Sequence, residues 1–189
     1  MLLYENALWL LFAALILDGI IGDPDWLWRR LPHPVVWIGK AISALDQTLN
    51  RKDWRAQTRR FTGIVTLLIL LVGSLALGVL FQKLAATIPF GELLIVVIAA
   101  VLIAQKSLYD HVAAVRDGLQ NNGLSGGRQA VAMIVGRDPN TLDEAGVSRA
   151  AIESCAENFS DGIVAPVFWF AVLGLPGLIA YKAVNTADS

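Results

Sequence analysis

Long apolar runs separated by polar segments dominate the chain. Residues 62–81 are apolar and uncharged, and about 20 such residues let a helix cross a bilayer. Residues 7–21 are also apolar apart from Asp18 and Gly19, and counting from Leu2 brings this run to spanning length. Asp18 would then lie near a membrane surface. This pattern predicts an all-α, polytopic integral membrane protein.

A third apolar run, residues 93–104, is too short to span alone. Apolar side chains continue on one helical face as far as Leu119, so we expect this helix to run on to that residue. Residues 121–123, Asn-Asn-Gly, should then stop it, because Gly and Asn readily adopt the left-handed conformation that ends helices.

The first polar segment, residues 22–61, begins with turn-forming residues. Gly22 and Pro24 should end the preceding helix, and Pro34 should open an amphipathic helix on the cytoplasmic side. A basic cluster follows, made of Arg51, Lys52, Arg55, Arg59 and Arg60. It either anchors the next span by the positive-inside rule or contacts anionic lipid, and we favour the anchor.

Residues 149–166 carry the densest polar signal. Ser148 is the expected cap of a helix on which Arg149, Glu153 and Glu157 share one face. By spacing alone this is a surface helix with an Arg–Glu pair. Thr141 to Glu144 fits a capping box just upstream, and residues 160–162, Ser-Asp-Gly, are expected to turn the chain.

The last apolar run, residues 163–180, contains Gly174 and Pro176 near its middle. It forms either a straight span or two half-helices that fold back. Such breaks persist in membranes when protein covers them. We expect the re-entrant hairpin, because it returns the polar residues 181–189 to the side on which the other polar segments lie.

Composition agrees with a single membrane-embedded domain over residues 1–189. The chain is 56% hydrophobic and 16% charged, whereas soluble domains have about 25% charged residues. The formal net charge of −1 gives no reason to expect nucleic acid as a partner. Cys155 is the only cysteine, which excludes an internal disulfide and a four-thiolate zinc site.

The distribution of basic residues predicts the orientation of the chain in the membrane. Residues 22–61 and 105–162 hold every Lys and Arg except Lys83 and Lys182. Both segments lie on one side if the apolar runs between them form a hairpin. The positive-inside rule makes that side the cytoplasm.

Several short motifs resemble, in order, those of the cobalamin-biosynthesis CobD/CbiB family, the adenosylcobinamide-phosphate synthases. They are Gly22-Asp23-Pro24, His33-Pro34-Val35, Ile134 to Asp138, Ala151 to Glu153, Ala156 to Asn158, Ser160 to Gly162, Ala165-Pro166, Tyr181-Lys182, and Asn185-Thr186 with Asp188-Ser189. Each fragment is weak alone, but the ordered set is specific. Family members continue past the last motif, so we expect this chain to be an N-terminal fragment.

The resemblance implies an inner-membrane, ATP-dependent ligase that needs Mg²⁺. Such an enzyme attaches aminopropanol or aminopropanol phosphate to the free propionate of adenosylcobyric acid through an amide bond. Other membrane proteins of the late cobalamin pathway are candidate partners, beside the lipid bilayer itself.

Motif membership and side-chain chemistry together predict the site residues. The catalytic candidates are Glu153, Glu157, Asp161 and His33. The substrate-binding candidates are Arg137, Asn158, Lys182 and Asn185. The candidate Mg²⁺ ligands are Asp23, Asp138, Glu157 and Asp161.

Each candidate also has a structural interpretation. Asp23 before a proline is often a turn residue, the Arg137-Asp138 pair can be a surface pair, and Lys182 can extend from a helix end toward water. His111, outside every motif, is expected on a solvated helix face. The competing hypothesis for function is a non-enzymatic transporter or signalling protein. A transporter would place ionisable groups at mid-membrane. Here they cluster in the two long polar segments, and only Asp18 lies within an expected span.

Overall fold

The computed structural model describes residues 6–136 and 138–188, and all regular structure in this part of the chain is helical. The helices are α1 (Ala7–Ile21), α2 (Asp25–Trp28), α3 (Pro34–Leu49), α4 (Ala56–Thr87), α5 (Gly91–Leu102), α6 (Gln105–Val131), α7 (Glu144–Phe159), α8 (Ala165–Leu173) and α9 (Leu175–Asp188), with a 3-10 turn η1 (Pro139–Thr141) and a π-helical segment η2 (Ser160–Val164). The all-α prediction is confirmed, and Pro34 opens α3 as expected.

Two stretches of the described chain are long and apolar enough to cross a membrane, namely α4 and the stretch Gly91–Val131 that contains α5 and α6. Helix α4 leaves large apolar side chains exposed along its length, among them Leu68, Val72 and Leu80. Apolar side chains on an outer surface of this extent fit lipid rather than water. These features are consistent with a membrane protein.

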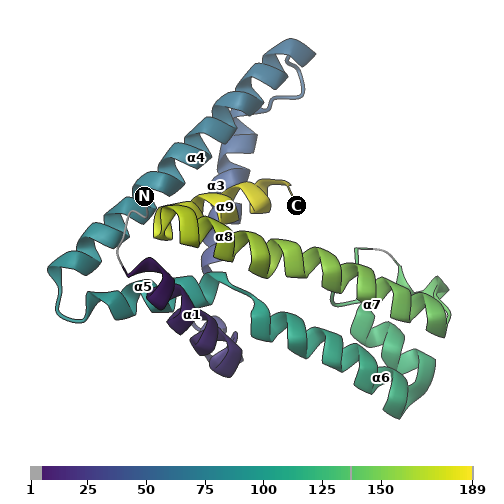
Figure 1. Cartoon of the computed structure of the whole chain (residues 1–189). Helices are drawn as coiled ribbons and strands as arrows, with labels where there is room; N and C mark the ends of the chain where they lie inside the picture. Colours follow the sequence, from purple (N-terminus) through teal and green to yellow (C-terminus); the bar gives the residue numbers. More distant parts are fainter. Residues whose placement is uncertain (1–5, 137, 189) are drawn as a thin grey trace.

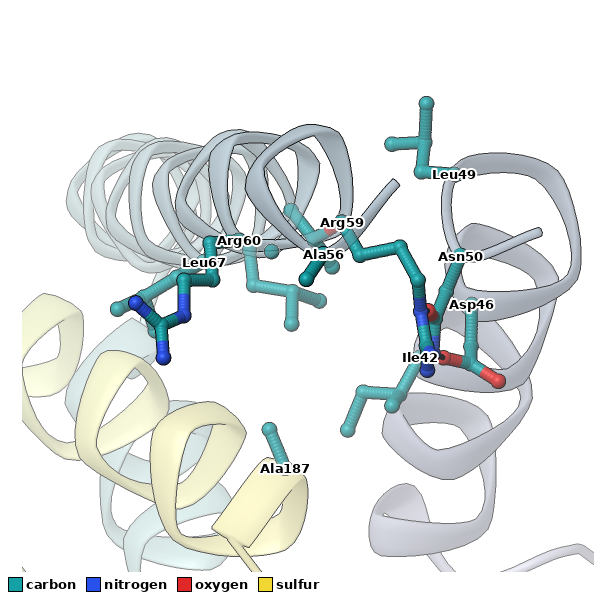
Figure 2. A pocket seen from close by; sticks show the side chains of 12 residues that line it. Ile42, Asp46, Leu49, Asn50, Ala56, Arg59, Arg60, Leu67 and Ala187 are labelled. Carbon is teal, nitrogen blue, oxygen red and sulfur yellow. Dashed lines mark hydrogen bonds between the residues drawn. The ribbon is translucent and has the colours of Figure 1, made fainter. Parts of the chain in front are cut away.

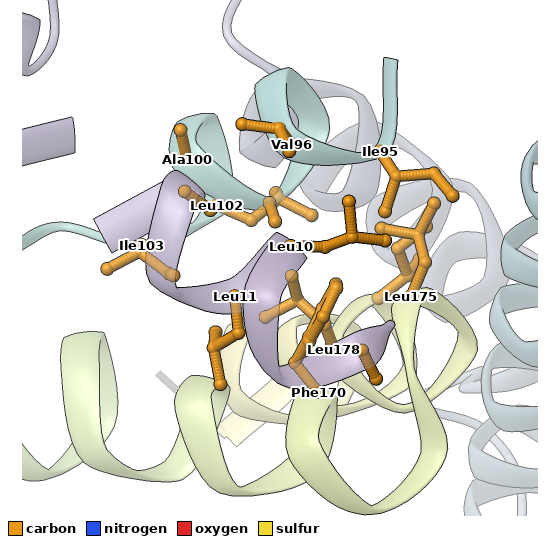
Figure 3. Packing of buried hydrophobic residues seen from close by; sticks show 14 of the residues in the cluster. Leu10, Leu11, Ile95, Val96, Ala100, Leu102, Ile103, Phe170, Leu175 and Leu178 are labelled. Atoms are coloured by element: carbon orange, nitrogen blue, oxygen red, sulfur yellow. The ribbon is translucent and has the colours of Figure 1, made fainter. Parts of the chain in front are cut away.

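The apolar core lies where α1 packs between α5 and the α8–α9 pair (Figure 3). Leu10 and Leu11 of α1 contact side chains that include Ile95 of α5 and Phe170 of α8. Leu178 of α9 is fully buried in the same cluster. We refer to this cluster as the apolar core.

Helices α6 and α7 form a second unit, which extends from the rest of the molecule in Figure 1. Its small cluster joins Val115 and Val131 of α6 to Val147, Ala150 and Ala151 of α7. We call this unit the α6–α7 arm. The chain reverses at Gly123, where φ is 60°, so the predicted stop after Asn121 and Asn122 is confirmed.

The expected continuous helix from residue 93 to Leu119 is wrong. Helix α5 ends at Leu102 and α6 begins at Gln105. The Ala104 N–H donates to the Gly162 carbonyl oxygen at 3.1 Å instead of continuing the helix. A carboxylate from α1 caps the new start, because Asp18 Oδ2 accepts from the Gln105 N–H at 2.8 Å.

Two expectations around α7 are also wrong. The helix begins at Glu144 with Asp143 as its cap, since the Asp143 carboxylate accepts from the Gly146 N–H at 2.7 Å. Neither Ser148 nor Thr141 caps it; Ser148 lies within the helix and donates to the Glu144 carbonyl oxygen. Among the ion pairs described, Arg149 lies 3.9 Å from the Asp143 carboxylate.

The expected turn at residues 160–162 is a π-helical segment instead. Phe159, Ser160 and Val164 all keep right-handed helical angles, so α7, η2 and α8 form one continuous rod. The extra residue per turn of a π-helix shifts the face that later residues present. Gly162 is therefore a point of altered helical register and not a chain reversal.

The predicted break in the last apolar run is confirmed. Gly174 has φ 68° and separates α8 from α9, which folds back against α8 (Figure 1). Helix α9 also packs closely on α4, where Gly78 lies against the Pro176 backbone and leaves no room for a Cβ atom. A straight span over residues 163–180 is excluded in this fold.

Candidate functional site

The linker between α1 and α3 brings Asp23 and His33 together. His33 Nε2 lies 3.6 Å from Asp23 Oδ1, and the Trp28 indole N–H donates to the same oxygen at 3.2 Å. His33 Nδ1 accepts from the Val35 N–H at 3.3 Å and so caps α3. Because Nδ1 accepts, Nε2 carries the proton in the neutral ring and faces the Asp23 carboxylate.

Lys182 is the centre of the site. It lies on α9 with only 9% of its surface exposed. Burial lowers the pKa of Lys182, while the Asp161 and Asp23 carboxylates favour its charged form. Lys182 is thus a nearly buried lysine whose positive charge is partly compensated by two nearby carboxylates.

Tyr181 links η2 to α9. Its hydroxyl donates to Asn185 Oδ1 at 3.4 Å, one turn further along α9. Burial, followed by the charge of the Asp161 carboxylate, raises the pKa of Tyr181. We call Asp23, His33, Asp161, Tyr181 and Lys182 the Lys182 cluster. Tyr181 belongs to a motif that precedes Lys182, but a tyrosine at this position indicates no role from sequence alone.

The π-helical segment places Asp161 in this cluster. Its Gly162 carbonyl accepts from Ala104, so η2 is tied to the α5–α6 junction. π-Helical turns are rare and often occur at functional sites. Sequence periodicity does not reveal them, which is why Asp161 was expected in a turn.

Asp18 supports the same region from α1. It is 3% exposed, and its carboxylate accepts from the N–H groups of Gln105 and Lys106, which start α6. The sequence shows an aspartate inside an apolar run, which indicates that Asp18 has a polar partner. It does not show which partner, because Gln105 lies 87 positions further along the chain. Asp18 thus fixes where α6 begins relative to α1.

The remaining predicted residues lie in other places. Glu153 and Glu157 are exposed on α7, and Asp138 caps the 3-10 turn by accepting from the Asn140 backbone N–H at 2.9 Å. Asn158 donates to Ser154 on the same helix. Arg137 lies outside the described residues. The structure therefore brings Asp23, His33, Asp161 and Lys182 together, with Asn185 beside them through Tyr181.

Mg²⁺ is implied by the resemblance described above. The described side chains contain no group of three or more His, Cys, Asp or Glu placed to hold a metal. However, Mg²⁺ is commonly bound by one or two carboxylates, with substrate phosphates and water completing its shell. Asp23 and Asp161, which both act on Lys182, fit this mode of binding. Asp138 is used instead as the cap of the 3-10 turn, and Glu157 is exposed on α7.

A hollow of about 580 Å³ lies between α3, α4 and the end of α9 (Figure 2). Arg59 and Arg60 line it on α4, and Ala187 lines it on α9. Arg59 is held by a hydrogen bond from its Nε to Asn50 Oδ1 at 2.8 Å. The hollow carries two guanidinium groups next to the last motif of the chain.

A smaller cavity of about 330 Å³ lies at the base of the arm. His111 and Ser107 of α6, Asn158 of α7 and Gly162 of η2 line it, together with residues 133–135. His111 is half-buried there, so the expected solvated position is wrong. The reason is that the turn after α6 folds back over this part of the helix.

Comparison with known proteins places this arrangement in a family. The family described as CobD/Cbib protein matches residues 11–189. The chain belongs to the CobD/CbiB family. The Lys182 cluster therefore draws its members from four separate CobD/CbiB motifs, which the fold brings to one point.

The cobalamin biosynthesis protein CobD of Rhizobium meliloti (strain 1021) is 60% identical over 181 residues, covering 95% of this chain and 55% of the relative. The protein of that name from a Sinorhizobium species is 59% identical, covering 98% and 58%. Its counterpart in Brucella suis biovar 1 (strain 1330) is 53% identical, covering 98% and 57%. The chain thus spans a little over half the length of these CobD proteins. No solved structure gives a significant match.

Proposed function

We propose that this protein acts in cobalamin biosynthesis as an ATP-dependent ligase. It would join aminopropanol or its phosphate to the free propionate of adenosylcobyric acid, giving adenosylcobinamide or its phosphate. The observation that carries the proposal is the convergence of four CobD/CbiB motifs on the buried Lys182. The names of the relatives support the pathway.

Amide formation sets the demands on the site. A carboxylate does not react with an amine in water until it is activated, here by phosphoryl or adenylyl transfer from ATP. Lys182 is suited to bind the propionate carboxylate, because it is the cationic member of a nearly closed cluster. Tyr181 and Asn185 border the same position and can orient the carboxylate oxygens.

The negative charge of the ATP phosphates must also be offset during phosphoryl or adenylyl transfer. Asp23 and Asp161 would hold Mg²⁺ together with the phosphates of ATP, and the bound ion would neutralise part of their charge. Arg59 and Arg60 offer further cations in the hollow beside α9, and guanidinium groups match phosphate geometry. The basic segment would then bind ATP in addition to orienting α4 in the membrane.

The enzyme would work at the cytoplasmic face of the inner membrane, where ATP is available. The fold back of α9 against α8 supports this orientation, because it keeps Lys182 beside Asp23 and Asp161 instead of across the bilayer from them. Partners in this proposal are the two substrates, the lipid bilayer and other membrane proteins of the pathway.

Complementation tests the proposal. The complete gene is introduced into a cobalamin auxotroph that lacks its own CobD, and adenosylcobinamide products are measured by mass spectrometry. We expect growth and the amide product with the unaltered gene, and much less amide product with Lys182→Met. Growth without any amide product, or no growth despite normal protein levels, would instead favour the non-enzymatic alternative, a transporter or signalling protein.

A further inference from the structure

The cavity at the base of the α6–α7 arm has an unusual polar lining. Among the described residues that line it, none carries a formal charge unless the His111 ring is protonated. It is also small, at about 330 Å³, which suits a ligand of a few heavy atoms and excludes a corrin ring. The side chains that can contact such a ligand through hydrogen bonds are Ser107, His111 and Asn158.

The nitrogen donors of this lining are already used within the protein. His111 Nδ1 lies 2.7 Å from the Ser107 carbonyl oxygen, and because a carbonyl can only accept, Nδ1 must carry the proton. The Asn158 amide group donates to the Ser154 carbonyl at 2.8 Å. The N–H groups of residues 133–135 donate to Ala130 and Val131 carbonyls within their own turn.

What remains for a ligand is two acceptors and a hydroxyl. With its proton on Nδ1, the neutral His111 ring has a lone pair on Nε2, and Asn158 keeps its carbonyl oxygen Oδ1. The Ser107 hydroxyl can accept or donate. Because the described lining residues include no Lys or Arg, this set favours a ligand that donates hydrogen bonds, such as an amine, and disfavours an anion.

We propose that this cavity binds the amino group of a small amino alcohol, with His111 as the base that deprotonates it. The inference rests on the proposed function, which requires such an amine. One proton moves from the ammonium nitrogen to His111 Nε2, giving a neutral amine and an imidazolium that returns the proton to water. The amine then forms the C–N bond to the activated carboxyl carbon, and the C–O bond to the phosphate or AMP leaving group, which ATP has supplied, breaks. The second proton that the nitrogen loses on becoming an amide passes to the regenerated His111 ring and from there to water.

The position of the cavity supports this role. Gly162 forms part of its wall, and the preceding residue, Asp161, belongs to the Lys182 cluster. The amine site and the carboxylate site thus lie at neighbouring residues of η2. A base is most effective when its ordinary pKa is near neutrality, which is true of imidazole.

Histidine ring signals offer a direct readout, because the given sequence contains two histidines, His33 and His111. The full-length protein is labelled at histidine, placed in lipid nanodiscs and titrated with 1-amino-2-propanol while the ring signals are followed by NMR. The signals of His33 and His111 are identified by their loss in the His33→Gln and His111→Gln variants. We expect the His111 signals to move and the His33 signals to stay. 1,2-Propanediol, which lacks the amine, should leave both unchanged. Unmoved His111 signals, equal shifts at both rings, or the same shift with the diol would each overturn the inference.

Two variants connect binding to turnover. His111→Phe keeps a planar ring but removes the acceptor, and it should raise the KM for the amino alcohol at least tenfold and also lower kcat. His111→Gln, which restores an acceptor oxygen, should recover amine binding more than kcat. Tyr109→Phe, at an exposed position on the same helix, is the matched control and should change neither. Equal kinetics for His111→Phe and Tyr109→Phe would overturn the inference.

The failure of this inference can be separated from failure of the proposed function. If the unaltered protein makes the amide but His111 does not respond to the amine, the cavity assignment is wrong and the ligase proposal stands. If His111 responds to the amine but no amide is ever formed, the ligase proposal is wrong, and the inferred role of His111 as its base falls with it.

Discussion

The apolar core and the α6–α7 arm are both built only from helices, yet they are stabilised in different ways. The core packs residues of five described helices, α1, α4, α5, α8 and α9, into a large cluster, and two ionisable residues, Asp18 and Lys182, are buried in this part of the molecule. The arm packs a helix pair around a few small residues, and its one buried polar side chain in the described part is Ser154, which donates to the Ile134 carbonyl at 2.6 Å. Ionisable groups are thus buried beside the thick core and not in the thin arm.

This difference indicates where chemistry can be supported. A buried charge is costly unless other groups compensate it. At the junction of the two regions, Asp18 is satisfied by the start of α6, and Lys182 has Asp161 and Asp23 beside it. The arm adds uncharged acceptors on the other side of η2. The core therefore contributes ionisable side chains, and the arm contributes uncharged polar side chains, to the region around η2.

The largest expected effect comes from overfilling the core. Gly78→Leu should prevent α9 from packing on α4, because even a Cβ atom at Gly78 would overlap the Pro176 backbone. We expect little folded protein, measured as loss of the monodisperse peak in detergent. Gly73→Leu, on the same helix but facing open space, is the control and should purify normally. Equal behaviour of both variants would contradict the described α4–α9 contact.

The second prediction addresses the junction. Lys182→Met should lower kcat/KM about 100-fold, the usual order for removing one charge-stabilising group. The melting temperature should not fall, since a methionine avoids the desolvation cost of a buried amine. Lys83→Met, at an exposed lysine on α4, serves as control. Normal turnover by the Lys182 variant would remove Lys182 from the site.

The third prediction addresses the arm. Val147→Ala deletes two buried methyl groups and should destabilise the arm by about 2 kcal/mol. Hydrogen exchange should become faster in α6 and α7 while the core amides keep their protection, because the two clusters are separate. Ile152→Ala, at a position 68% exposed on the same helix, should leave exchange unchanged. Faster exchange throughout the protein would mean that core and arm unfold as one unit.

The smallest effect is expected in the basic hollow. Arg60→Gln should raise the KM for ATP about tenfold, which corresponds to one charge-assisted hydrogen bond of about 1.5 kcal/mol. Arg55→Gln removes a nearby charge that does not line the hollow and should have little effect. If both changes raise the KM equally, the segment acts through its overall charge, as an anchor or a lipid contact would, and not as a binding site.

Much of the fold could be predicted from local sequence. The apolar run at 62–81 lies within α4, and Pro34, Gly123 and Gly174 act where their backbone preferences indicate. The cap of α7 was misassigned although the signal was present, since Asp143 directly precedes Glu144 and aspartate caps helices as well as serine does. Ser148, Thr141 and Asp143 were all possible caps, and the sequence alone did not decide between them.

The candidate site was only partly predictable, because its key contacts are long-range. Asp23, His33, Asp161 and Lys182 could be named from motifs, but their convergence depends on the fold back of α9 and on the π-helical register of η2. The cap that Asp18 provides for α6 joins residues far apart in sequence. His111 belongs to no motif, and only the folded turn at residues 133–135 encloses it.

The continuous rod formed by α7, η2 and α8 has a mechanical consequence. It runs from Glu144 to Leu173, so at about 1.5 Å per residue it is roughly 45 Å long. Helix α8 packs in the core and α7 packs in the arm, with η2 and Asp161 between them. Because the rod is continuous, a rotation of α7 about its axis would be transmitted to η2 and would turn Asp161 relative to Lys182. A ligand or partner that rotates α7 would therefore alter the Lys182 cluster.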